Sequence, residues 1–190
     1  MRKIIRFFKN LFKRKLPEPI NEPLNWGFII PHTYKAQGAS NKSGTITEYE
    51  YADKMAWKTK IHAQFRDNGG VSGAASRLSE LGCNASIEPH LNAFNGKAKG
   101  FEILAIAGDS KSISEGIRIA KAFKERFPDR VLRHGNGVKI VHRGDRGYKN
   151  LEAARFAGMS VALLSEAFFL DNPDEWIDHQ DMASFWESVL

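Results

Sequence analysis

Residues 161–170 have the sequence VALLSEAFFL, which is apolar at every position except Ser165 and Glu166. The continuous apolar run from Val161 to Leu164 predicts a buried strand. Short apolar runs and amphipathic segments alternate along the rest of the chain. Further strands are expected at 26–30, 84–88, 101–107 and 138–141, and helices at 48–66, 73–81, 112–127, 149–157 and 173–188. This alternation predicts an α/β fold in which helices flank a largely parallel sheet.

The composition is that of a single globular domain with a short appendage. The chain has 190 residues, of which 42% are hydrophobic and 26% are charged. Cys83 is the only cysteine, so an intrachain disulfide and a zinc site built from several cysteines are both excluded. No apolar stretch approaches the roughly 20 residues that a membrane-spanning helix needs.

The positive charge is concentrated at the N-terminus. Of the 28 Lys and Arg residues, seven lie in residues 1–15, which contain no acidic residue. The remaining 21 are balanced by 22 acidic residues, so residues 16–190 carry a net charge of about −1. Nucleic-acid binding requires a basic face on the folded body and is therefore not expected.

Apolar residues in this N-terminal stretch recur at helical spacing, with the basic residues between them. We expect residues 1–16 to form an amphipathic segment that binds an anionic membrane surface, with a solvated basic tail as the alternative. Arg6 and Lys9 interrupt the apolar core that a cleavable signal peptide needs, so no such signal is recognised. Three prolines predict a stiff linker over residues 17–23, and the folded domain is expected over 24–190.

Four polar residues lie at the predicted ends of strands and helices, where sites gather in such folds. His32 and His90 each follow a predicted strand, Glu48 begins a predicted helix, and Glu166 interrupts the apolar run. Glu48 is in helical phase with the apolar residues Ala52, Met55 and Ala56, so it is expected to point inward. A buried carboxylate needs a cation or several donors.

Two imidazoles and one carboxylate form the ligand set of a catalytic zinc with an open coordination position. The alternatives are structural histidines and a glutamate that stabilises the helix start. Glu166 is expected in a desolvated environment that raises its pKa, which suits a general acid or base. A structural acid paired with an arginine such as Arg146 is the alternative for this residue.

Four motifs together resemble the zinc-dependent N-acetylmuramoyl-L-alanine amidases of bacterial cell-wall turnover and phage lysis. They are WGFIIPH at 26–32, TEYEYAD at 47–53, HLNA at 90–93 followed by KGFE at 99–102, and LSEAFFLDN at 164–172. The resemblance implies that His32, Glu48 and His90 bind one zinc ion and that Glu166 is the catalytic acid and base. It also implies a mixed sheet of about six strands and hydrolysis of the amide between muramic acid and L-alanine in peptidoglycan.

The chain departs from the pattern of this family near the proposed ligands. Glu88 and Pro89 precede the second histidine where serine and an apolar residue are common, and Ala167 replaces a glycine after Glu166. Four further residues are candidates for orienting the site or contacting substrate: Asn92, Glu102, His142 and Arg143. His62, His134 and His179 are interpreted as bystanders.

Two other functions remain open from the sequence. One is a zinc peptidase that cuts within the stem peptide, and the other is a non-catalytic protein that binds membrane or cell wall. The resemblance places the action on the cell wall, in the periplasm or at the cell surface. A phage enzyme that is made in the cytoplasm and released from there fits the same sequence.

Overall fold

The computed structural model describes residues 23–190, so the expectations for residues 1–16 and for most of the linker lie outside the described residues. The strands are β1 (Trp26–Ile30), β2 (His62–Phe65), β3 (Ala85–Asn92), β4 (Glu102–Ile106), β5 (Val138–Val141) and β6 (Val161–Phe169). The helices are α2 (Glu48–Ala56), α3 (Gly70–Glu80), α4 (Ser110–Arg126), α5 (Tyr148–Phe156) and α6 (His179–Val189), with one 3-10 turn over Pro173–Glu175.

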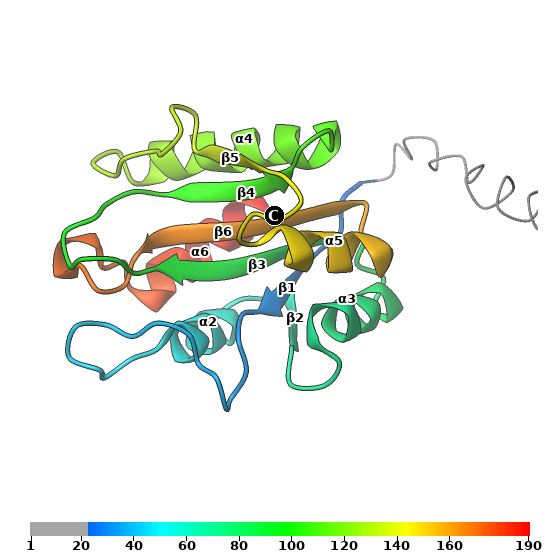
Figure 1. Ribbon diagram of the computed structural model, residues 1–190, viewed down its shortest axis with the longest axis horizontal. Coiled ribbons are helices and arrows are strands. Elements are labelled where there is room, and N and C mark those ends of the chain that lie inside the picture. Colours follow the sequence, from blue (N-terminus) through cyan, green and yellow to red (C-terminus); the bar gives the residue numbers. More distant parts are fainter. Residues whose placement is uncertain (1–22) are drawn as a thin grey trace, which may run out of the picture.

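The six strands form one sheet in the order β2-β1-β3-β6-β4-β5 (Figure 1). All neighbouring pairs are parallel except β4 and β6, which are antiparallel. The predicted α/β fold with a mixed, largely parallel sheet of six strands is therefore confirmed. The apolar run that starts at Val161 is the central strand β6, and all nine of its residues are buried.

Helices cover the two faces of the sheet unequally (Figure 1). On one face, α2, α4 and α6 pack over Phe28, Ile87 and Ile103 in the larger core. On the other face, α3 and α5 form a smaller core with Ile29 and Leu164. Within residues 23–190, these two helices lie only over the part of the face where β3 and β6 begin, so the second halves of β3 and β6 have no helix above them there.

The single helix predicted over 48–66 is wrong. Helix α2 ends at Ala56, and residues 62–65 form the edge strand β2, which pairs with β1. The apolar residues of the predicted helix therefore divide between two elements, on either side of the turn after Trp57. Ala52, Met55 and Ala56 are buried on α2, whereas Ala63 packs against the core from the strand. Backbone hydrogen bonds to β1, more than 30 residues away, outweigh the local helical pattern.

Two strands run past their predicted ends, and the last helix is interrupted. Strand β3 continues to Asn92 and β6 to Phe169, so His90 and Glu166 lie within strands and not after them. Asn172 caps a short 3-10 turn instead of a long helix, and α6 begins only at His179, where the Asp178 side chain caps it. None of the helices within residues 23–190 has both the length and the apolar character that crossing a membrane requires.

Candidate active site

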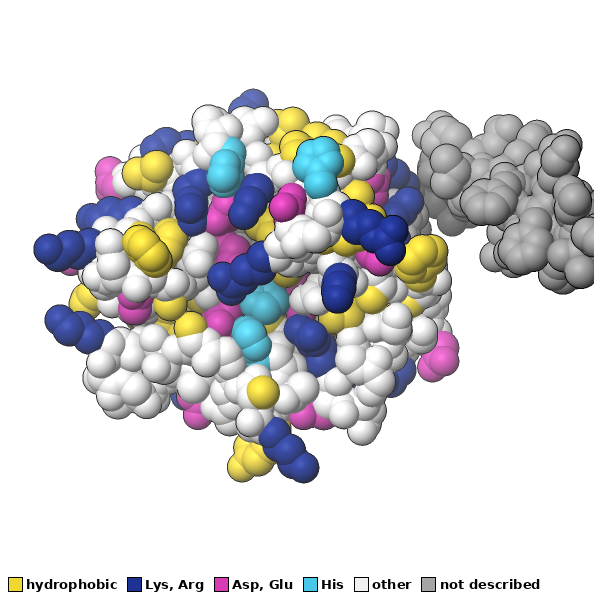
Figure 2. All heavy atoms as spheres, viewed as in Figure 1, with side chains coloured by type: hydrophobic (Ala, Val, Ile, Leu, Met, Phe, Trp, Pro, Cys, Tyr) yellow, Lys and Arg dark blue, Asp and Glu magenta, His cyan; other side chains and the backbone are white. Residues whose placement is uncertain are grey.

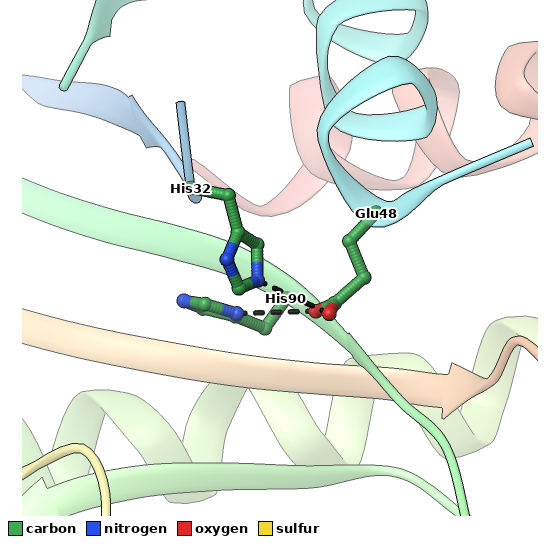
Figure 3. Close-up of side chains that lie close together, drawn as sticks. All are labelled: His32, Glu48 and His90. Carbon is green, nitrogen blue, oxygen red and sulfur yellow. Dashed lines mark hydrogen bonds and ion pairs between the residues drawn. The ribbon is translucent and has the colours of Figure 1, made fainter. Parts of the chain in front are cut away.

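The structure brings His32, Glu48 and His90 together from three separate elements (Figure 3). One ligand atom from each lies within 4.8 Å of the others. His32 Nε2 is 3.1 Å from one oxygen of Glu48, and His90 Nδ1 is 3.2 Å from the other. The two imidazole rings lie 4.9 Å apart at an angle of 77°. The spacing is compatible with one metal ion held by two imidazoles and one carboxylate.

The carboxylate of Glu48 is fixed in place from several sides. Glu48 is the first residue of α2, which begins with a capping box formed by Thr47 and Glu50. The Glu48 oxygens accept hydrogen bonds from the backbone N–H groups of Ala39, at 2.7 Å, and Leu91, at 3.1 Å. Burial raises the pKa of Glu48, but hydrogen bonds and charge from both histidines outweigh it and hold this pKa well below its usual range.

The loop after β1 shapes the space around His32. His32 has a φ of +64°, in the left-handed region, which turns its side chain back toward Glu48. Gly38, with a φ of +79°, leaves this space open, because a Cβ there would collide with the His32 ring and the Glu48 carboxylate. His32 Nε2 and His90 Nε2 are both buried, and they face carboxylate oxygens of Glu48, at 3.1 Å, and Glu88, at 3.3 Å. Buried ring nitrogens that face ionised carboxylates fit a metal-binding site.

Glu88 lies beside His90 and adds negative charge to the site. Its carboxylate accepts hydrogen bonds from Arg66 at 2.7 Å and Asn150 at 3.0 Å, and it lies 3.3 Å from His90 Nε2. Burial lowers the pKa of His90, but the charge of Glu88 and hydrogen bonds that the His90 ring donates to Glu48 and Glu88 raise it to about 10. A field that stabilises a protonated imidazole also stabilises a bound cation.

Glu166 lies next to this triad on β6. In the sheet register it is the partner of His90 on β3 and of Glu102 on β4. Its side chain is buried, and Oε2 has no hydrogen-bond partner. Burial, opposed in part by the charges of His90 and Arg146, raises the pKa of Glu166 to about 7. A carboxyl group with this pKa can both accept and donate a proton near neutral pH.

Glu166 and Arg146, the pair considered as the structural alternative, form a long ion pair. Arg146 Nη2 lies 3.7 Å from Glu166 Oε1, and the arginine side chain is mostly exposed. His142 and Arg143 lie in the same loop after β5, but both side chains are exposed. Of this loop, Arg146 is the residue that lines the cleft beside Glu166.

Glu102 gathers three polar side chains at the edge of the site. It accepts hydrogen bonds from Asn92 at 3.2 Å and Arg133 at 2.7 Å, and it lies 2.6 Å from His134 Nε2. Glu102 is the register partner of Glu166, and Asn92 is hydrogen-bonded to it, while a role of either residue in orienting the site stays a prediction. Sequence reasoning missed Arg133 and interpreted His134 as a bystander. The only nearby sequence feature that could have drawn attention to these two residues is the glycine-rich segment after Arg133, in the connection between α4 and β5.

The two other histidines lie away from the triad. His62 is exposed on the edge strand β2, and His179 packs against Tyr51 at the start of α6, with the two rings 4.5 Å apart.

A cleft of about 490 Å³ opens on the uncovered part of the sheet. Its lining includes Asn92, Glu102, Arg133, Lys139, Arg146 and Glu166. Figure 2 shows this face, with histidine and acidic side chains near its middle and lysine and arginine side chains around them. The site therefore combines a candidate metal centre, a buried carboxyl group and room for an extended substrate.

Comparison with solved structures identifies this architecture. The chain superimposes on the N-acetylmuramoyl-L-alanine amidase AmiC2 of Nostoc punctiforme with a TM-score of 0.65 and 13% identity, covering 87% of this chain and 93% of that one. It also superimposes on the catalytic domain of the amidase CwlV of Bacillus (Paenibacillus) polymyxa var. colistinus, with a TM-score of 0.64 and 18% identity, covering 88% of this chain and 100% of that one.

The fold is that of N-acetylmuramoyl-L-alanine amidases. The catalytic domain of an endolysin targeting Clostridia difficile has the same amidase fold, with a TM-score of 0.62, 20% identity and coverage of 86% of this chain and 94% of that one. No protein-family model matches the chain, and no curated relative does. Within this fold, His32, Glu48 and His90 lie together, and Glu166, the register partner of His90, lines the neighbouring cleft.

Proposed function

We propose that this protein is a zinc-dependent N-acetylmuramoyl-L-alanine amidase, which hydrolyses the amide between the lactyl group of muramic acid and L-alanine in peptidoglycan. The observation that supports this proposal is the triad of His32, Glu48 and His90 beside Glu166, which lines an open cleft in an amidase fold. Zinc is the proposed metal because the donor set is two imidazoles and one carboxylate, with no cysteine available.

The chain's own residues account for the chemistry that an amide requires. His32, Glu48 and His90 would hold the zinc ion, which as a Lewis acid polarises a substrate carbonyl and eases the deprotonation of a water molecule. Glu166 would take the proton from that water and deliver it to the leaving nitrogen. Its pKa of about 7 suits both transfers, since neither protonation state is then strongly disfavoured at neutral pH.

A zymogram that contains purified sacculi, run with and without a chelator, tests the proposal. The wild type should clear the gel, and a chelator should abolish clearing that added zinc restores. Glu166→Gln keeps the size of the side chain and removes its proton transfer, so its activity should fall by about 100-fold or more. Glu80→Gln, an exposed glutamate on α3, is the matched control. Full activity of Glu166→Gln would remove this mechanism.

Product analysis separates the amidase from a zinc peptidase. An amidase releases glycan chains without peptide and intact peptides that begin with L-alanine, and mass spectrometry distinguishes these from stem-peptide fragments. Fragments cut between stem residues would instead support the peptidase. A substrate in the cell wall also places the action of this protein at the wall.

A further inference from the structure

The cleft extends from Glu166 toward β5 and contains a second group of charged residues that the hydrolytic chemistry does not use. Three cationic side chains, Arg133, Lys139 and Arg146, line it together with two carboxyl groups, Glu102 and Glu166. We propose that Arg133 and Lys139 form a subsite for a free carboxylate of the stem peptide, located two or three residues from the scissile amide. This inference rests on the proposed function and specifies which substrates it favours.

Arg133 is held in a fixed orientation. Its Nη1 donates a 2.7 Å hydrogen bond to Glu102, whose carboxylate is buried. The guanidinium group also lies over the Phe169 ring, 5.2 Å from its centroid. Its remaining N–H groups donate no hydrogen bond to residues 23–190. Because Glu102 and Phe169 fix the guanidinium group and its other N–H groups remain available in the cleft, Arg133 is preorganised to bind a carboxylate.

Lys139 is placed by the sheet itself. It lies on β5, in register with Leu104 on β4, and Leu104 is two residues from Glu102 on the same face of that strand. Lys139 is partly buried and lines the cleft, yet it forms no ion pair or hydrogen bond with any side chain of residues 23–190. A carboxylate that enters the cleft can therefore form an ion pair with the ammonium group of Lys139.

The balance of charge favours an anionic ligand. Glu102 is already compensated by Arg133 and by His134, which lies 2.6 Å away. Arg146 lies 3.7 Å from Glu166, so these two charges offset each other. Lys139 therefore contributes positive charge that no carboxylate among the described residues of the cleft neutralises.

The spacing of the strands selects the position of the carboxylate. Strands β6 and β5 are separated by β4, so their axes lie roughly 10 Å apart. An extended peptide advances about 3.5 Å per residue, so two or three residues span this distance. A peptide whose scissile amide lies at Glu166 thus brings its second or third residue to Lys139 on β5. Arg133 lines the same cleft from the loop before β5, where it is hydrogen-bonded to Glu102 on β4.

Two synthetic muramoyl pentapeptides that differ in one group test the inference. In one, the second residue is D-glutamate with a free α-carboxylate, and in the other this group is the amide. The zinc-loaded wild type should hydrolyse the carboxylate substrate with a kcat/KM about tenfold higher. Lys139→Gln and Arg133→Gln should each lose most of this preference, mainly through KM for the carboxylate substrate. Lys121→Gln on α4, with the same change of charge on the other side of the sheet, should retain it.

Binding to the Glu166→Gln variant, measured by calorimetry with the same two peptides, gives a second readout that does not need hydrolysis. If neither peptide is cleaved, the amidase proposal fails, and the binding preference still decides the subsite. Equal kcat/KM values and equal affinities for the two substrates would overturn the subsite. So would a preference that survives in both Lys139→Gln and Arg133→Gln.

Discussion

At the scale of single residues, the environment of Glu166 predicts a pH-dependent stability. The pKa of this carboxyl is raised from 4.5 to about 7 in the folded state, chiefly by burial. The folded protein therefore binds more protons than the unfolded chain between these values, and the contribution of Glu166 to stability is lost as pH rises from about 4.5 to 7. Ionised Glu166 then costs up to about 3 kcal/mol.

Glu166→Gln should remove this cost in the metal-free protein. Urea unfolding should give similar stabilities for wild type and variant near pH 4.5, with the variant more stable by as much as about 3 kcal/mol at pH 8. The exposed Glu80→Gln serves as control and should show no such trend. A constant difference across this pH range would contradict the buried, proton-binding Glu166.

At the scale of elements, the loop between β1 and α2 offers a pair of glycines that separates backbone strain from crowding of the site. Gly38 and Gly44 both have positive φ, at +79° and +70°. A Cβ at Gly38 would meet His32 and Glu48, whereas a Cβ at Gly44 would meet nothing within 4 Å. Backbone strain should cost alanine about 1 kcal/mol of stability at either position, and at Gly38 the collision adds to this cost.

Only Gly38→Ala should weaken zinc binding, by about tenfold or more, because it displaces two proposed ligands. Competition with a chromogenic chelator measures this affinity, and circular dichroism monitors the unfolding of both variants. Equal zinc affinities for Gly38→Ala and Gly44→Ala would argue against a metal centre under this loop.

At the scale of the whole molecule, the candidate metal centre links three separate elements, so binding should stabilise the entire domain. Zinc at about 100 times its Kd should add about 2.7 kcal/mol and raise the midpoint of thermal unfolding by roughly 5–10 °C. His90→Ala should show no such rise, while magnesium should have little effect on the wild type. An unchanged midpoint with zinc would exclude tight binding to the folded state.

The separation of charge between the N-terminus and the body leads to a second prediction at this scale. Residues 1–15 carry seven basic groups, whereas residues 16–190 are close to neutral. Deleting residues 1–16 should therefore abolish binding to anionic vesicles and leave hydrolysis of a soluble muramoyl peptide unchanged. Vesicle co-sedimentation at low and high salt measures this, and unchanged binding of the shortened chain would refute the membrane role of the segment.

Much of the architecture could be predicted from local patterns. The apolar runs at β1, β5 and β6 and their alternation with amphipathic segments were sufficient to predict the α/β class, and the helix predicted to begin at Glu48 does begin there. The inward direction of Glu48 followed from its phase with Ala52 and Met55. Local patterns failed where pairing between distant segments decides the secondary structure. Residues 62–65 were predicted to be helical, but they pair with β1 as strand β2, and α2 ends before them.

The sequence by itself determined most of the elements and which chemical groups are available, since burial, capping and helical phase depend on neighbouring residues. Only the tertiary structure decided that His90, Glu166 and Glu102 lie in one row across three strands. It also decided that Arg133 and His134 contact Glu102. The reason is that strand register and loop placement depend on contacts between residues far apart in the chain, and no local pattern encodes these contacts.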